Sequence, residues 1–212
     1  MTRIIAGSAR GRRLTVPPAG TRPTSDRVRE ALFSTLDSEL GAAGLGWGEV
    51  RVLDLFAGSG AFGLEALSRG AAGAVLVEKS RAAAAVISAN VDAVGCPGAR
   101  VLVRDARQLA ALPPPEGGAD LCFADPPYDW SAADLTTLLS ALHASGWLSD
   151  DARVVVERPA RDHASPLPDM WGESRRRAYG DTVLWYGQVS SDRAGDRHPH
   201  GADKVRGREG SL

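Results

Sequence analysis

Apolar positions along this chain follow two patterns, and each predicts a different kind of element. From residue 50 onward, short and nearly continuous apolar runs predict buried strands, and the segments between them repeat apolar residues at helical spacing. The predicted strands cover 52–56, 74–78, 100–103, 119–125 and 153–157, and the predicted helices cover 61–68, 81–94 and 134–143. Such alternation predicts an α/β fold with a mostly parallel sheet that helices cover on both faces.

The N-terminal part has a different pattern. Two short β-like runs, 3–6 and 12–16, flank the glycine-bounded segment 7–11 and predict a hairpin with a flexible, basic turn. Prolines then interrupt the chain, and Thr24 or Ser25 can cap a helix with an apolar face. We therefore predict a hairpin and a helix as an extension ahead of the alternating part.

The C-terminal part begins with two runs, 175–179 and 182–189, on either side of Gly180 and Asp181. So short a connection requires antiparallel pairing, which predicts a hairpin at the edge of the sheet. From residue 190 the chain is polar and has no periodicity, which predicts a disordered tail. The expected organisation is an extension over 1–48, a main domain over 49–189 and the tail over 190–212.

Composition narrows the class of protein. The 212 residues are 43% hydrophobic and 24% charged, which is ordinary for a globular domain with an extension. No stretch is long and apolar enough to span a membrane, and the N-terminus lacks the apolar core of a signal peptide. Cys96 and Cys122 lie far apart without histidines at metal-binding spacing, so we expect neither a disulfide nor a metal site. These features predict a cytoplasmic protein.

The net charge of -1 hides a basic N-terminal segment. Before Glu30, Asp26 is the only acidic residue, and seven arginines are present: Arg3, Arg10, Arg12, Arg13, Arg22, Arg27 and Arg29. A general preference of this chain for arginine explains the scarcity of lysine but not the missing acids. We therefore predict that these arginines form a phosphate-contacting, RNA-binding arm.

A glycine-rich loop follows the predicted strand 52–56 and opens the next helix. Gly58, Gly60 and Gly63 fit the pattern G-x-G-x-x-G, and Glu78 lies twenty residues after Gly58 at the end of the next strand. This is the fingerprint of a dinucleotide-binding site. A turn without a ligand is the alternative, but three glycines weaken the start of a helix unless something approaches the backbone closely.

Asp54 separates the possible ligands of this loop. A dinucleotide would bring its pyrophosphate to the helix N-terminus, where the Asp54 carboxylate would repel it. S-adenosylmethionine carries a sulfonium and an ammonium group, which Asp54 attracts. Glu78 would then accept hydrogen bonds from the ribose, and Asp105 from the adenine amino group or, alternatively, from a backbone amide as a helix cap. The predicted cofactor-binding residues are Asp54, Phe56, Gly58, Gly60, Glu78, Asp105 and Ala106.

The run Asp125-Pro126-Pro127-Tyr128 closes the apolar strand 119–125. The Asp125 carboxylate and the Pro126 carbonyl can accept both hydrogens of an aromatic amino group, which turns the nitrogen lone pair toward a methyl donor. The prolines fix the backbone, and Tyr128 can stack on the base. A turn that ends a strand is the alternative, but ligands of such sheets bind at the carboxyl ends of the strands. We predict Asp125, Pro126 and Tyr128 as the catalytic residues of an amino-group methyltransferase.

The chain also resembles a known family. The resemblance is carried by RIIAG at 3–7, RPTSDRVREALF at 22–33, DLFAGSG at 54–60, EALSRGA at 65–71 and DPPY at 125–128. It covers most of the chain, and these motifs resemble the RsmD family of bacterial methyltransferases, which modify N2 of a guanine, position 966, in 16S ribosomal RNA. The resemblance implies a class I, Rossmann-like methyltransferase fold with a mixed seven-stranded sheet whose last strand is antiparallel. It also implies that the N-terminal extension helps bind ribosomal RNA.

Other functions remain as alternatives. An amino methyltransferase acting on DNA adenine or cytosine, or on a protein glutamine, would use the same chemistry at 125–128. A nicotinamide-dependent oxidoreductase would use the glycine loop, although Asp54 counts against it. An RNA-binding protein with an inactive methyltransferase fold is a further class, against which Asp54, Glu78 and Asp125 count. We expect a monomer that uses S-adenosylmethionine and acts on 16S RNA, on the 30S subunit or on an assembly intermediate.

Overall fold

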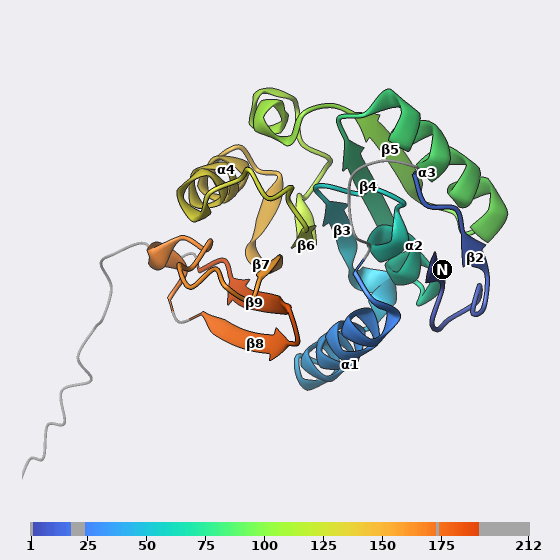
Figure 1. The fold of residues 1–212 in the computed structure, drawn as a ribbon, viewed down its shortest axis with the longest axis horizontal. Helices are drawn as coiled ribbons and strands as arrows, with labels where there is room; N and C mark the ends of the chain where they lie inside the picture. Colours follow the sequence, from blue (N-terminus) through green and yellow to red (C-terminus); the bar gives the residue numbers. More distant parts are fainter. Residues whose placement is uncertain (1, 18–23, 173, 191–212) are drawn as a thin grey trace, which may run out of the picture.

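The computed structural model describes residues 2–17, 24–172 and 174–190, and its centre is one mixed β-sheet (Figure 1). The strands lie in the order β5-β4-β3-β6-β7-β9-β8. Their bounds are β3 (Arg51–Asp54), β4 (Gly73–Glu78), β5 (Ala99–Val103), β6 (Ala119–Ala124), β7 (Leu148–Pro159), β8 (Arg175–Tyr179) and β9 (Thr182–Gln188). The strands β3 to β7 run parallel, and β9 pairs antiparallel with both β7 and β8. The seven-stranded mixed sheet and its hairpin at the edge confirm the predicted fold class.

Helices cover both faces of this sheet. One face carries α1 (Asp26–Ala42), α2 (Ala61–Ser68) and α3 (Arg81–Val94), and the other carries α4 (Ala132–Ala144) with the 3-10 helix η2 (Ala106–Ala111). Side chains alternate along β6: Leu121 and Phe123 pack with α1 to α3, and Cys122 and Ala124 pack with α4. This alternation explains why β6 reads as a continuous apolar run, since both faces of the strand are buried.

The N-terminal hairpin is present but shorter than predicted. It pairs β1 (Thr2–Arg3) with β2 (Arg13–Leu14), and its first turn is fixed against α2. The fully buried Glu65 accepts hydrogen bonds from the backbone N–H groups of Ile5 and Ala6, at 2.6 and 3.0 Å. The prediction of a flexible turn is therefore wrong for the start of the turn, which these hydrogen bonds hold in place.

Gly7 shows how closely this turn is packed. It has φ +79°, and a Cβ atom there would lie 1.8 Å from the carbonyl oxygen of Ser68. The Ser68 hydroxyl also accepts from the backbone N–H of Ala9 and donates to the carbonyl oxygen of Ala6. At the far end of the turn, Gly11 has no atom within 4 Å of such a Cβ. Only the outer part of the turn is therefore free of neighbours.

The predicted helix of the extension is confirmed, with Ser25 as its cap. The Ser25 hydroxyl accepts from the backbone N–H of Val28, and the helix runs to Ala42. Part of the segment 41–48, which reads as a glycine-rich linker, is therefore helical, and the 3-10 helix η1 (Trp47–Glu49) follows it. Buried side chains of α1 and of the hairpin join those of the sheet in one hydrophobic cluster, so the extension and the main domain share a core.

The strand β7 is longer than the predicted 153–157, because the exposed polar residues Asp150 and Asp151 near its start hide the apolar pattern. The helices predicted over 61–68 and 81–94 match α2 and α3 at both ends. In the described part of the chain, no helix has the length and apolar character needed to cross a membrane. Apart from Ser190, the predicted disordered tail lies outside the described residues.

Candidate active site

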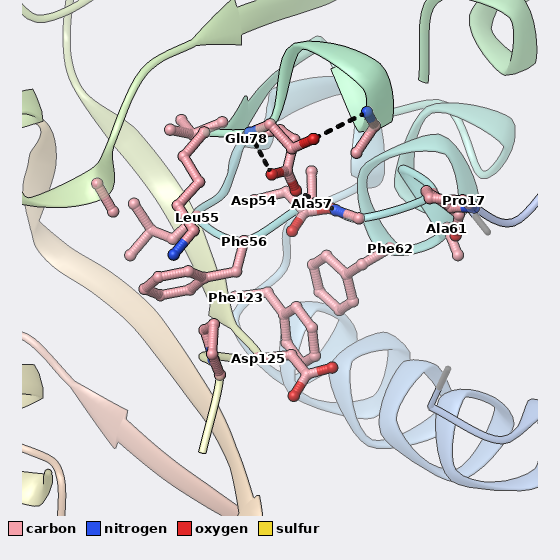
Figure 2. Close-up of a pocket in the computed structure, with 18 of the residues that line it drawn as sticks. Pro17, Asp54, Leu55, Phe56, Ala57, Ala61, Phe62, Glu78, Phe123 and Asp125 are labelled. Carbon is pink, nitrogen blue, oxygen red and sulfur yellow. Dashed lines mark hydrogen bonds between the residues drawn. The ribbon is translucent and has the colours of Figure 1, made fainter. Parts of the chain in front are cut away.

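A cavity of about 350 Å³ opens at the carboxyl ends of the central strands (Figure 2). Its walls come from the β3–α2 loop, the ends of β4 and β6, the start of η2 and the N-terminal extension. Figure 2 shows Asp54 and Glu78 on one side and Asp125 on the other, with the rings of Phe62 and Phe123 between them. These two rings stack at 4.0 Å between centroids, with 11° between their planes.

Glycine is needed at the three positions of the loop for different physical reasons. A Cβ atom at Gly60 or Gly63 would lie 3.0 or 3.1 Å from the Leu76 side chain, so these two allow α2 to pack closely on β4. Gly58 has φ +55° and lines the cavity, where its Cβ would meet nothing nearer than 3.9 Å. Close approach of a ligand can therefore explain Gly58. Gly60, predicted to bind cofactor, is not among the residues that line the cavity, and the close packing against Leu76 gives it a reason of its own.

Asp54 ends β3 and lies beneath the loop. It is 1% exposed, and its carboxylate accepts a hydrogen bond from the backbone N–H of Gly63 at 3.1 Å. Burial raises the pKa of Asp54 to about 7, and the negative charge of Glu78 adds to this effect. A carboxylate in this environment gains strongly from a cationic ligand, because a nearby positive charge favours its ionised form.

Glu78 ends β4 and holds the loop from the other side. Its two carboxylate oxygens accept hydrogen bonds from the backbone N–H groups of Gly58, at 3.1 Å, and Ser80, at 2.8 Å. Asp105 caps η2 by accepting from the backbone N–H of Arg107 at 2.9 Å, as one of the two alternatives predicted, and it also lines the cavity. The structure thus brings Asp54, Phe56, Gly58, Glu78, Asp105 and Ala106 together around one cavity.

Asp125 follows β6 and faces the same cavity as Asp54. Burial, and then the negative charges of Glu157 and Asp54, raise the pKa of Asp125 well above its usual range. Pro127 lines the cavity, while Pro126 is buried beside it and is not among the lining residues. The side chain predicted to stack on the base, Tyr128, is 71% exposed and borders a second hollow instead.

Several lining residues were not predicted from the sequence. Val16, Pro17 and Thr24 come from the extension, and Phe62 and Phe123 come from α2 and β6. The motif at 22–33 was a signal for Thr24, although the sequence indicated only a helix cap there. Phe62 and Phe123 look like ordinary core residues in the sequence, and only the fold shows that they reach the cavity.

The arginines of the predicted arm divide into two groups. Arg3, Arg10, Arg12, Arg13 and Arg27 are exposed, as a phosphate-contacting surface requires. Arg3 also lies 3.7 Å from Asp26, at the edge of an ion pair between exposed side chains. Arg22 lies outside the described residues.

Arg29 differs from the exposed arginines, since its side chain is 2% exposed and lines the cavity. One terminal nitrogen, Nη2, donates to the carbonyl oxygen of Arg3 at 2.6 Å and to Asp26 at 2.8 Å. The other two nitrogens, Nε and Nη1, are buried without a hydrogen-bond partner among the described residues. Arg29 is therefore not placed to contact a phosphate at the open surface, contrary to its predicted role in the arm.

Comparison with known proteins agrees with this geometry. The family model described as "Conserved hypothetical protein 95" matches residues 2–188. Ribosomal RNA small subunit methyltransferase D of Escherichia coli strain K12 is 39% identical over 183 residues, which is 85% of this chain and 86% of that protein. The solved structure of yhhF, a protein of Escherichia coli described as a methyltransferase, has a TM-score of 0.75 and 34% identity. That match covers 90% of this chain and 98% of the other.

A more distant structure has the same fold. It is an RNA methyltransferase of Salinibacter ruber in complex with S-adenosyl-L-homocysteine, with a TM-score of 0.57 and 15% identity, covering 86% of this chain and 100% of that one. The match of the family model and the identity to the Escherichia coli protein, both over most of the chain, establish the relationship. The protein belongs to the RsmD family, the family of ribosomal RNA small subunit methyltransferase D.

Proposed function

We propose that this protein transfers a methyl group from S-adenosylmethionine to N2 of guanine 966 in 16S ribosomal RNA. One observation carries the proposal: Asp54 and Asp125, at the ends of the neighbouring strands β3 and β6, face a single cavity. The first carboxylate suits a cationic methyl donor, and the second suits an amino group that loses a proton. The relatives named for methylation of small-subunit ribosomal RNA support the choice of substrate.

The cavity favours S-adenosylmethionine over a dinucleotide. Asp54, Glu78 and Asp105 place carboxylates along the side that would hold the cofactor, and a pyrophosphate there would meet like charge. Glu78 accepts from two backbone N–H groups and retains lone pairs for the ribose hydroxyls. The Salinibacter ruber enzyme, which has the same fold, holds S-adenosyl-L-homocysteine.

Arg29 suits the carboxylate of the same cofactor. Both Asp54 and Arg29 lie against the first turns of α2: Asp54 accepts from Gly63, and Arg29 lies close enough to Glu65 for the two charges to interact. A negatively charged and a positively charged side chain at this point match the ammonium and the carboxylate of the methionine part of the cofactor. Nε and Nη1 of Arg29 lack hydrogen-bond partners among the described residues, so a cofactor carboxylate that reached them would relieve the cost of leaving them buried and unsatisfied.

The methyl transfer then follows from position and proton acceptance. The Asp125 carboxylate and the Pro126 carbonyl accept the two hydrogens of the guanine amino group, and this directs the nitrogen lone pair at the methyl carbon. The nitrogen–carbon bond forms while the carbon–sulfur bond breaks, and the electron pair stays on sulfur as a neutral thioether. The nitrogen becomes positive, and Asp125 takes its proton. Alignment of nitrogen, carbon and sulfur supplies much of the rate.

The RNA is proposed to bind across the exposed arginines of the extension and Tyr128. Arg10, Arg12 and Arg13 lie on or beside the outer part of the hairpin turn, where phosphates can reach them. Tyr128 is 71% exposed, beside Arg161, and its ring can stack on a base that has left its own stack. We expect a monomer in solution, with 16S RNA, an assembly intermediate or the 30S subunit as the substrate.

The test is methylation with labelled S-adenosylmethionine of 16S RNA and 30S particles from cells that lack the gene. Mass spectrometry of the digested RNA should show one new methyl group, on N2 of guanine 966. A methyl group found only on adenine, on ribose or in DNA would refute the substrate. Calorimetry should show binding of S-adenosylhomocysteine and none of NAD, and the reverse result would refute the cofactor.

A further inference from the structure

Three carboxylates follow one another along the edge of the sheet. Asp54 ends β3, Asp125 follows β6, and Glu157 lies near the end of β7. The strands β3, β6 and β7 are neighbours, and Ala124 pairs with Val156, so Asp125 and Glu157 occupy the next positions of the same parallel pair. Alternation along both strands directs these two side chains to the face covered by α1 and α2.

Thr24 connects the last two carboxylates. Its hydroxyl donates a hydrogen bond to Oε2 of Glu157 at 2.7 Å and also lies within hydrogen-bonding reach of Asp125, whose pKa it lowers. Thr24 and Asp125 line the cavity, whereas Glu157 lies behind them, is 9% exposed and is not a lining residue. Glu157 therefore touches neither the cofactor nor the base, and any part it has in the reaction must pass through Thr24 and Asp125.

We propose that Glu157 is a positioning residue for the methyl transfer: it holds Thr24 against Asp125 and makes Asp125 a stronger proton acceptor. This rests on the proposed function, in which Asp125 takes the proton of the amino nitrogen. The proposal also gives a reason for a glutamate on β7 where the preceding positions carry valine.

The electrostatics agree with this role. The Thr24 hydroxyl donates its hydrogen to Glu157, and its contact with Asp125 lowers the pKa of Asp125, against the effect of burial. Burial raises the pKa of Glu157 as well, and the hydrogen bonds from Thr24 and Thr182 oppose this effect. In its ionised form, Glu157 raises the pKa of Asp125 above what burial alone produces. Asp54 acts in the same direction, and the Arg158 guanidinium opposes both.

Arg158 cannot cancel this effect. Its Nη2 donates to the backbone carbonyl oxygen of Trp130 and to the carboxylate of Asp162, both at 2.7 Å, so its charge is already paired. The hydrogen bonds that Glu157 accepts from the described residues come from the neutral hydroxyls of Thr24 and Thr182. Its negative charge therefore acts on Asp125 with little compensation.

The experiment compares Glu157→Gln with Thr24→Val. Glutamine keeps the size of the side chain and an oxygen for Thr24 but removes the charge. Valine keeps the charge and removes the hydroxyl bridge. The pKa of Asp125 is measured by NMR on protein with carbon-13 in its carboxyl groups, with Asp125→Asn assigning the signal. This measurement needs neither RNA nor turnover, so it stands even if the proposed substrate is wrong.

We expect Glu157→Gln to lower the pKa of Asp125 by about one to two units, as removal of a buried like charge requires. The acid limb of the pH profile of kcat should move to lower pH by the same amount, and kcat on the alkaline side should fall about threefold to tenfold, since a weaker base is a poorer proton acceptor. Thr24→Val should raise the pKa of Asp125 further, because the Thr24 hydroxyl lowers that pKa, and Thr24→Ser should restore any loss of kcat.

Two results would overturn the proposal. In the first, Glu157→Gln has an unchanged Asp125 pKa with normal thermal stability and normal affinity for S-adenosylhomocysteine. In the second, Glu157→Gln and Thr24→Val have the same effects, which would make Glu157 only an anchor for the start of α1. Absence of turnover in the wild-type protein would count against the proposed function alone, because the NMR measurement would still decide the role of Glu157.

Discussion

Replacing Asp54 by asparagine should make the protein more stable and, at the same time, a poorer binder of its cofactor. Asp54 is 1% exposed, and burial raises its pKa to about 7 from an ordinary value of 3.8. Because the folded chain keeps a proton that the unfolded chain loses, the free energy of unfolding falls as pH rises from about 4 to about 7. Asparagine removes the charge and can still accept from the backbone N–H of Gly63.

The size of the effect follows from the shift. Three pKa units correspond to about 4 kcal/mol at most, at 1.4 kcal/mol per unit, and relaxation around the buried charge makes roughly 2 kcal/mol a reasonable lower figure. For a chain of this length, Asp54→Asn should raise Tm by roughly 5 to 10 °C at pH 8. At pH 3.5 the aspartate is protonated in both states, so the two proteins should unfold at nearly the same temperature.

Cofactor binding should change in the opposite direction. The ammonium of S-adenosylhomocysteine needs the ionised form of Asp54, so the Kd of the wild-type protein should rise up to tenfold for each pH unit below about 7. Asp54→Asn should bind about 100-fold more weakly at pH 8, with little change between pH 6 and pH 8. Calorimetry measures the affinities, and thermal unfolding at both pH values measures stability. A destabilised Asp54→Asn at pH 8, or a wild-type affinity that is independent of pH, would refute the reasoning.

The remaining predictions concern the other parts of the site and the arm. Asp125→Asn should abolish methyl incorporation while the Kd of S-adenosylhomocysteine stays within twofold, and a large loss of affinity would remove Asp125 from the substrate side. Arg29→Met should raise that Kd at least tenfold but leave binding of methylthioadenosine, which lacks the amino-acid part, unchanged; equal weakening of both ligands in calorimetry would refute carboxylate binding. Changing Arg10, Arg12 and Arg13 together to alanine should raise the KM for RNA and flatten its log–log salt dependence by about 0.7 to 0.9 for each phosphate that is no longer neutralised. An unchanged salt slope would move RNA binding to another surface.

The sequence allowed the sheet to be predicted well, because its signals are local. Near-continuous apolar runs such as 119–125, bounded by turn signals, fit a strand that is buried on both faces. The helices at 61–68 and 81–94 have clear boundaries in a glycine loop and a serine cap. The start of β7 was missed for the opposite reason, since its first residues are polar and exposed and only pairing with β6 makes them a strand.

The site could be predicted in part, for a related reason. Asp54, Glu78 and Asp125 each follow or end a predicted strand, and the rule that parallel strands end at one edge brings them together. Arg29 and Glu157 could not be assigned in this way. Arg29 belongs to a basic segment whose other described arginines are exposed, and it is buried where its Nη2 reaches the backbone of Arg3 in the hairpin. Glu157 gains its importance from the Thr24 hydroxyl, which lies 133 positions away in the sequence.

The contacts of the extension have a consequence for how RNA binding and methyl transfer are connected. Glu65 and Ser68 hold the start of the hairpin turn, and Asn90 binds the backbone of both Thr15 and Ser59, one in the extension and one in the glycine loop. These hydrogen bonds join the hairpin that carries Arg3, Arg10, Arg12 and Arg13 to the same part of the structure as the glycine loop, which is proposed to bind the cofactor. An RNA that binds these arginines is held at a fixed distance from the methyl donor, and the orientation of the target base depends on the RNA rather than on closure of the protein. The RNA must therefore hold its target base at the right distance from the phosphates that bind the arm. This requirement suits recognition of a folded RNA by its shape.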